Sequence, residues 1–151
     1  MVVRCANPAD ISGIASLIER YWEFESIGGF SRPGMESLLH SLFSEPAPGA
    51  CWVAAANGAL QGYLVCAFML SLEHGGLMAE IDELFVLPEA RSRGLGALLL
   101  QEAERDLAAR GLVRWQLQVA VDNRRARVFY ERQGFSARAG YALLDKSLRR
   151  R

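Results

Sequence analysis

The fold is decided by Leu84-Phe85-Val86-Leu87-Pro88-Glu89-Ala90-Arg91-Ser92-Arg93-Gly94-Leu95-Gly96, which joins a predicted strand to a predicted helix. Residues 79–87 are strand-like, and residues 94–110 place leucines on one helical face before Arg110-Gly111 ends the helix. Unpaired amides and the positive end of the helix dipole meet where such a helix begins, and glycine lets a ligand approach the backbone. Residues 91–97, termed the cradle, are therefore predicted to bind an anion.

The segments on either side of this stretch predict an α+β fold. Hydrophobic periodicity and turn residues predict strands over residues 2–5, 51–56, 60–72, 79–87 and 115–121, two more within 135–148, and helices over 11–21, 35–43, 94–110 and 123–134. Tight turns such as Asn57-Gly58 favour antiparallel pairing of the early strands. The helix over 94–110 joins two strands by a crossover, which favours one parallel pair.

Length and composition limit the class of protein. The chain has 151 residues, enough for one domain with one core, and its 51% hydrophobic and 23% charged residues are typical of a soluble globular protein. The longest apolar run, residues 63–70, is too short to cross a bilayer, and the N-terminus lacks a signal-peptide core. We therefore expect a cytoplasmic protein with no membrane partner.

The chain has few residues that bind metals or form disulfides. Its cysteines, Cys5, Cys51 and Cys66, are widely spaced in strand-like segments, so we interpret them as small core residues. With only two histidines, His40 and His74, a multi-histidine metal site cannot form. We expect no metal.

The net charge of zero conceals an uneven distribution. Residues 1–90 carry a charge of −8 and residues 91–151 a charge of +8, which suggests that the two parts face different partners. A basic segment raises the question of nucleic acid, but its arginines are scattered and lack interleaved aromatic side chains. We therefore expect no nucleic-acid partner, and a solvated arginine-rich surface is the simpler reading.

Two common phosphate-binding motifs do not fit the cradle, but a family pattern does. A Walker loop would need Gly-Lys-Ser/Thr, and a dinucleotide fingerprint would need glycine in place of Leu99. The chain contains Arg91-x-x-Gly94-x-Gly96 after Leu84-Phe85-Val86, then Asn123-x-x-Ala126-x-x-Phe129-Tyr130-Glu131-x-x-Gly134-Phe135. With this joint pattern the chain resembles the GNAT superfamily of acetyl-CoA-dependent N-acetyltransferases, closely over residues 80–135.

The resemblance implies a mixed, mostly antiparallel central sheet flanked by about four helices, with one parallel β-α-β crossover that holds the cofactor. It implies one acetyltransferase domain over 1–151, an acceptor-shaping part over about 1–79, a cofactor-binding part over about 80–135, and C-terminal strands within 136–148. Acetyl-CoA is the implied co-substrate, its pantetheine arm lying between two splayed strands. The implied cofactor contacts are Leu84, Phe85, Val86, Arg91, Ser92, Arg93, Gly94, Leu95, Gly96, Ala97, Asn123, Arg127, Phe129 and Tyr130.

Candidate catalytic residues follow from the chemistry of amine acetylation. Asn123, Ala126 and Tyr130 share one helical face, and a tyrosine with an ordinary pKa of ~10 is able to protonate a departing thiolate of pKa ~8.5. A rim aromatic without a chemical role is the alternative for Tyr130. An alkylammonium must also lose a proton before it attacks. The candidate bases lie on one predicted strand: Glu80, Asp82 and Glu83.

Alternation along that strand places Glu80 and Asp82 on one face and Glu83 on the other, unless a bulge reverses the order. We expect Glu80 or Asp82 to act as the base, directly or through a water, with Glu83 as a further candidate. Three acids on a solvated face are the alternative.

The acceptor is predicted from the segment Trp22-Glu23-Phe24-Glu25, where aromatic and acidic residues alternate. Aromatic faces and carboxylates both stabilise ammonium groups, so a small cationic amine is the favoured substrate. A solvated helix end is the simpler reading of this segment. Three possibilities remain open: acetylation of protein amines, a catalytically silent acyl-CoA-binding module, and a homodimer.

Overall fold

The computed structural model describes residues 1–149. The chain divides into two compact units, Met1–Gln118 and Val119–Arg151. That the chain forms a single acetyltransferase domain stays a prediction.

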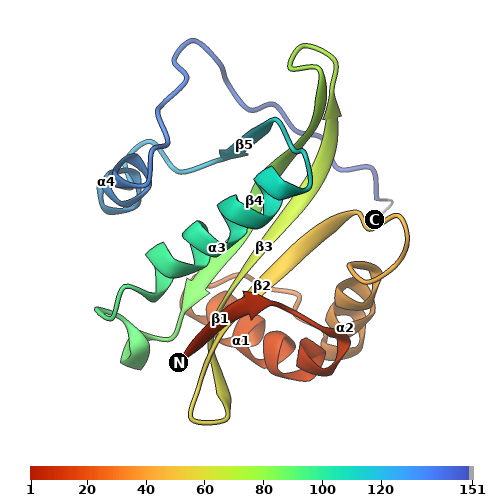
Figure 1. Ribbon diagram of the computed structural model, residues 1–151, viewed down its shortest axis with the longest axis vertical. Coiled ribbons are helices and arrows are strands. Elements are labelled where there is room, and N and C mark those ends of the chain that lie inside the picture. Colours follow the sequence, from red (N-terminus) through yellow and green to blue (C-terminus); the bar gives the residue numbers. More distant parts are fainter. Residues whose placement is uncertain (150–151) are drawn as a thin grey trace. The chain divides into compact units, whose positions relative to one another are not determined.

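Within residues 1–149 the structure confirms an α+β fold, with one mostly antiparallel five-stranded sheet and four α-helices (Figure 1). The elements are β1 (Val2–Cys5), α1 (Ile11–Phe24), α2 (Arg32–Ser41), β2 (Gly49–Ala56), β3 (Ala59–Ser71), β4 (Gly76–Val86), α3 (Leu95–Ala109), β5 (Arg114–Leu117) and α4 (Arg124–Arg132).

The sheet of the first unit follows chain order, β1-β2-β3-β4-β5. Its first three pairings are antiparallel, and β4 pairs with β5 in parallel through the crossover helix α3, as predicted. Asn57 and Gly58 form the turn between β2 and β3, both with positive φ (53° and 75°), which matches the two-residue turn that twisted hairpins favour.

The core of the first unit lies on both faces of this sheet. On one face, α1 packs against β4 through the rings of Tyr21 and Phe85, whose centroids are 5.4 Å apart. On the other face, α3 lies over the strands (Figure 1) and helps to bury Trp52 and Leu64, which lie opposite each other on β2 and β3. The middle of the sheet is therefore covered on both sides.

Strand β4 has two irregular features near its C-terminal end. Val65 of β3 pairs with Glu83, whereas the next residue, Cys66, pairs with Ile81, so Asp82 is the extra residue of a β-bulge. The last pair between β4 and β5 joins Ile81 to Leu117, and β4 continues to Val86. Residues 82–86 consequently lack a β5 partner on that edge.

From the end of β5 onward, the structure differs from the prediction. Helix α4 forms as expected, but β5 ends at Leu117, not Val121, and no strand forms within residues 136–149. The predicted C-terminal strands over 136–148 are thus wrong for the described residues. Their side chains are exposed, including Leu143 and Leu144, and no strand ladder uses their backbone groups. Gly140, at φ +89°, also interrupts extended backbone there.

The cysteines are all reduced, and two of them match the sequence interpretation. Cys51 and Cys66 are buried, which raises the pKa of both thiols and keeps them protonated. Cys5 is exposed instead, and its Sγ donates to the Asp106 carboxylate at 3.1 Å. Residues 1–149 contain no group of three His, Cys, Asp or Glu side chains able to hold a metal. Every helix in this range is too short or too polar to cross a membrane.

Candidate active site

The cradle lies between the end of β4 and the start of α3. Gly94 is the N-cap residue of α3 and has a left-handed backbone, with φ +71°. Ser92 has φ +69°, so the chain turns sharply just before the helix. The first amides of α3 have no acceptor within the helix and carry its positive dipole end. A Cβ atom added to Gly94 would meet no protein atom within 4 Å, so the approach to these amides is open.

Arg91 contacts both β4 and α1. Its Nε donates to the Val86 carbonyl at 3.0 Å, and its guanidinium lies over the rings of Phe24 and Phe85, at 5.3 and 5.7 Å from their centroids. A second link joins the same regions, because Arg20 of α1 pairs with Glu89 at 3.0 Å. Arg91 thus connects the end of α1 to the cradle, and the Arg20–Glu89 pair connects α1 to the turn just before it.

The open edge of β4 begins beside the cradle. Leu84 and Val86 pair with Leu64 and Gly62 of β3, which leaves their other edge unpaired by β5. Extended backbone of this kind can accept an extended ligand as if it were another strand. The sequence-predicted contacts at residues 84–86 and 91–97 therefore occur on adjoining segments of one unit.

Glu83 is held by side chains from two neighbouring elements. Trp22 Nε1 of α1 donates to its Oε2 at 2.9 Å, and the Tyr63 hydroxyl of β3 donates to its Oε1 at 2.8 Å. Burial is the main influence on this carboxyl and raises its pKa, the two hydrogen bonds lower it, and the charge of Asp82 raises it further. Glu83 is therefore a fixed, half-buried carboxylate whose pKa lies above its ordinary value.

The other two predicted bases are less enclosed. Glu80 accepts hydrogen bonds from Gln116 Nε2 at 2.9 Å and Gln118 Nε2 at 3.4 Å. Asp82 has an exposed side chain, yet desolvation, followed by the charge of Glu80, raises its pKa. Because the bulge interrupts alternation, Asp82 and Glu83 are not forced onto opposite faces, and their charges interact.

The predicted acceptor segment at the end of α1 does not form one continuous wall. Trp22 is half-buried and engaged with Glu83, while the face of Phe24, which is 61% exposed, is covered by Arg91. Glu23 and Glu25 remain exposed to solvent.

Sequence reasoning did not identify Tyr63, which is fully buried within an apolar strand. Its hydroxyl was the available signal, because a buried tyrosine oxygen needs a hydrogen-bond partner.

The predicted residues of the second unit lie on or around α4. Asn123 caps the helix, its side-chain oxygen accepting from the Ala126 amide at 3.2 Å. The Tyr130 ring packs edge-on against Phe129 and Phe135, with centroids 5.1 and 5.7 Å away. Arg127 donates to the Val121 carbonyl at 3.3 Å. These contacts support the predicted cap, while the roles of Asn123, Arg127, Phe129 and Tyr130 toward a ligand stay predictions.

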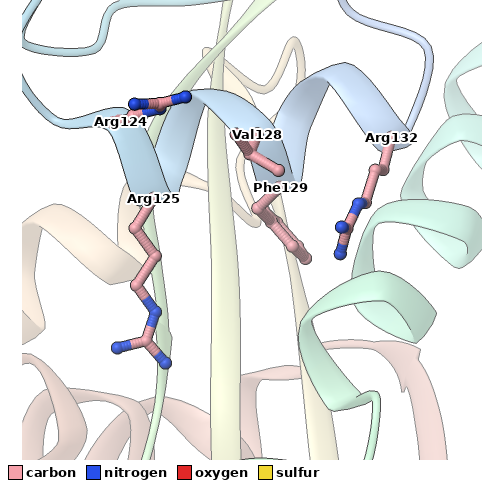
Figure 2. Close-up of a pocket in the computed structure, with 5 residues that line it drawn as sticks. All are labelled: Arg124, Arg125, Val128, Phe129 and Arg132. Carbon is pink, nitrogen blue, oxygen red and sulfur yellow. The ribbon is translucent and has the colours of Figure 1, made fainter.

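A shallow hollow of about 590 Å³ lies on this helix. Figure 2 shows three arginines and two apolar side chains around it: Arg124, Arg125, Val128, Phe129 and Arg132. Positive charge beside an aromatic ring suits an anionic group with a flat apolar part.

Comparison with known proteins gives one family. The profile described as "Acetyltransferase (GNAT) family" matches residues 14–135. An uncharacterized N-acetyltransferase of Archaeoglobus fulgidus is 30% identical over 135 residues, covering 88% of this chain and 91% of its own. The uncharacterized N-acetyltransferase YhfO of Bacillus subtilis is 29% identical over 141 residues, covering 93% of both chains.

A solved structure has the same fold over nearly the whole chain. It is the integron cassette protein HFX_CASS3, from the mobile metagenome of Cole Harbour Salt Marsh. It is 27% identical, with a TM-score of 0.85, and the match covers 98% of this chain and 91% of that one.

Proposed function

The chain belongs to the GNAT family of acetyltransferases and is an acyltransferase, and on this basis we propose its donor, acceptor and mechanism. It transfers an acetyl group from acetyl-CoA to a primary amine of a small cationic molecule. The amine attacks the thioester directly while both substrates are bound. Glu83, and not Glu80 or Asp82 as first expected, is the base, and Tyr130 protonates the departing thiolate.

The observation that carries this proposal is the position and environment of Glu83. It lies on the stretch of β4 that lacks a β5 partner, two hydrogen bonds fix it, and its pKa is raised. An alkylammonium of pKa ~10.4 must lose a proton at pH 7, which costs ~4–5 kcal/mol. A carboxylate whose pKa is raised toward that of the amine makes this transfer less unfavourable.

The proton balance assigns one task to each residue. The ammonium gives a proton to the Glu83 carboxylate, and the neutral nitrogen then forms a bond to the acetyl carbonyl carbon while the carbon–sulfur bond breaks. The sulfur takes a proton from Tyr130, and the amide nitrogen, losing its second proton, returns that proton to the tyrosine, directly or through water. The products are the acetylated amine and the free thiol, with one proton released from Glu83 to solvent.

The donor side fits acetyl-CoA, which supplies the activated thioester. Its phosphates match the open amides of the cradle around Gly94, and its extended arm matches the unpaired backbone of residues 84–86. In the second unit, the Asn123, Arg127, Phe129 and Tyr130 side chains are the proposed further contacts.

The acceptor side favours a cation because it is rich in unpaired acids. Glu23, Glu25, Glu80, Asp82 and Glu83 form none of the ion pairs found within residues 1–149. A cationic amine would provide the counter-charge that these carboxylates lack.

Thiol release from acetyl-CoA, measured with a panel of acceptors, tests this proposal. The panel contains a monoamine, a diamine, a polyamine, an aminoglycoside-like sugar, an amino-acid derivative and a lysine peptide. We expect the highest kcat/KM with a small amine of two or more charges. A preference for the lysine peptide would indicate protein amines instead. Acetyl-CoA binding without thiol release for any amine would contradict the assigned reaction.

A further inference from the structure

Two side chains from two elements of the first unit donate to the carboxylate of Glu83. Trp22 of α1 donates to one oxygen of Glu83 on β4, and Tyr63 of β3 donates to the other. We propose that Trp22 and Tyr63 are positioning residues that keep Glu83 ionised and correctly oriented for the acceptor amine. This inference rests on the proposed role of Glu83 as the base.

The need for such donors follows from the surroundings of Glu83. Burial favours the neutral acid, and the negative charge of Asp82 on the same strand acts in the same direction. Tyr21 of α1 also interacts electrostatically with Glu83 and is a neutral phenol. Within residues 1–149 no lysine, arginine or histidine pairs with Glu83, so the two neutral donors are its stabilising partners. Hydrogen bonds to the ionised form favour that form.

The position of Tyr63 suits hydrogen bonding to Glu83 as well as packing in the core. The residue is 0% exposed, and phenylalanine would fill the same space without a polar atom to satisfy. Its hydroxyl meets Glu83, whose charge also helps to raise the pKa of Tyr63, after burial, and keeps it a proton donor. Trp52 provides a contrast, because its buried Nε1 has no hydrogen-bond partner among the described residues.

Bonds from two different elements also fix the direction of the carboxylate. Each oxygen of a carboxylate accepts about two hydrogen bonds, so one donor on each leaves sites for the proton of an incoming ammonium. Loss of either donor would let the group rotate and would favour its neutral form. The first effect lowers kcat, and the second moves the pH at which the base becomes active.

The test measures the pH dependence of kcat/KM for the best acceptor amine in Tyr63→Phe and Trp22→Phe. We expect the acidic limb of each profile to move up by about 1 pH unit. We also expect kcat on the plateau to fall about 10-fold, as for other residues that orient a functional group, with the KM for acetyl-CoA within about 2-fold of the parent value. The double variant should show the larger shift.

Trp52→Phe is the matched control. It removes a buried indole on β2 that pairs with Leu64, the neighbour of Tyr63 that points to the opposite face of the sheet. It should lower the melting temperature without moving the acidic limb.

Two results would overturn the inference, and Glu83→Gln distinguishes failure of the positioning role from failure of the proposed base. If Glu83→Gln is inactive but the acidic limbs of Tyr63→Phe and Trp22→Phe coincide with that of the parent, the positioning role is wrong and the base stands. If Glu83→Gln retains full activity, the base itself is wrong. Should Tyr63→Phe not fold, the limb of Trp22→Phe decides, because Trp22 is only half-buried.

Discussion

The cradle and the surroundings of Glu83 are built in different ways. The cradle consists of consecutive residues, and its main feature is backbone conformation, with Gly94 at φ +71° before the first amides of α3. Glu83 is held by side chains that are 61 and 20 positions away along the chain. A site of backbone amides can serve any chain with the right turn, whereas a site of side chains is particular to this protein. The acetyl donor is therefore expected to be the same across the family, whereas the acceptor amine is expected to differ from one member to another.

The largest expected effect tests the acceptor region. Glu83→Gln removes the proposed base and should lower kcat/KM for the amine by about 10²–10³-fold at pH 7. Steady-state kinetics at saturating acetyl-CoA measures this. Glu45→Gln changes an exposed acid of the loop between α2 and β2 and should have no effect. A larger loss in Glu80→Gln or Asp82→Asn would move the role of base to that residue.

The next effect tests the donor region. Gly94→Val places a β-branched residue at positive φ, which costs ~1–3 kcal/mol, and its side chain would extend into the open approach to the amides. The rise in melting temperature caused by acetyl-CoA should disappear, as expected if Kd increases at least about 10-fold.

Gly58→Val is the control for this strain. Gly58 has φ +75° and equally open surroundings, but it lies in the turn between β2 and β3. It should lose stability and keep the rise caused by acetyl-CoA. An unchanged rise in Gly94→Val would remove the cradle from the proposal.

Tyr130→Phe tests the proposed acid of the second unit. Removal of the hydroxyl should lower kcat about 10-fold or more and leave the Kd for acetyl-CoA within about 2-fold, because the ring remains. Rapid-quench turnover and calorimetric binding measure the two quantities. Tyr141→Phe, at a 76% exposed tyrosine of the same unit, is the control. Parental turnover in Tyr130→Phe would return this residue to a packing role.

The cradle consists of consecutive residues, whereas the partners of Glu83 are distant in the chain. This difference explains which parts of the fold and of the candidate site the sequence could predict. Most helices and strands of the first unit were predicted to within a few residues, because each has its own turn and periodicity signals. The cradle could be predicted as a candidate anion site because its residues are consecutive. The contact of Tyr63 with Glu83 depends on the register of β3 against β4 and on the bulge at Asp82, which no local pattern fixes.

The C-terminal strands failed for a related reason. A strand requires a partner as well as an extended sequence, and residues 136–149 find none in the structure. Tyr141, Leu143 and Leu144 gave an apolar signal without indicating what would pair with them.

A smaller effect concerns the exposed acids at the end of α1. Glu23→Lys with Glu25→Lys should lower kcat/KM for a diamine about 3- to 10-fold, and less for a monoamine, with the KM for acetyl-CoA unchanged. Added salt should raise the KM for cationic amines and for acetyl-CoA, but not for a neutral acceptor, because exposed charges are screened beyond ~8 Å at 0.15 M. Glu45→Lys with Glu73→Lys is the control. Equal losses for all amines would contradict a cation-binding acceptor site.

The smallest expected effect is on how protein stability depends on pH, and it compares Asp82 on β4 with Glu89 next to the cradle. Desolvation and the charge of Glu80 raise the pKa of Asp82, so the folded state binds its proton more tightly than the unfolded state, where the pKa is ~3.9. Its contribution to stability is complete below pH ~3.9 and is lost as pH rises through the folded pKa. Just before the cradle, the hydrogen bond from Arg20 lowers the pKa of Glu89, so the contribution of Glu89 to stability is present at neutral pH and is lost on acidification.

Thermal melts at pH 7 and pH 4 should therefore show changes in melting temperature of opposite sign for substitutions at Asp82 and at Glu89. At pH 7, Asp82→Asn should raise the melting temperature, by less than about 2–4 °C because the group is exposed, and Glu89→Gln should lower it. Both differences should shrink at pH 4. Asp82 is then partly protonated in the folded state, and Glu89 is partly protonated in the unfolded state. A gain in Asp82→Asn that stays constant or grows on acidification would show that the acids of β4 are well hydrated. That result would remove desolvation as the cause of the raised pKa on which the acceptor region depends.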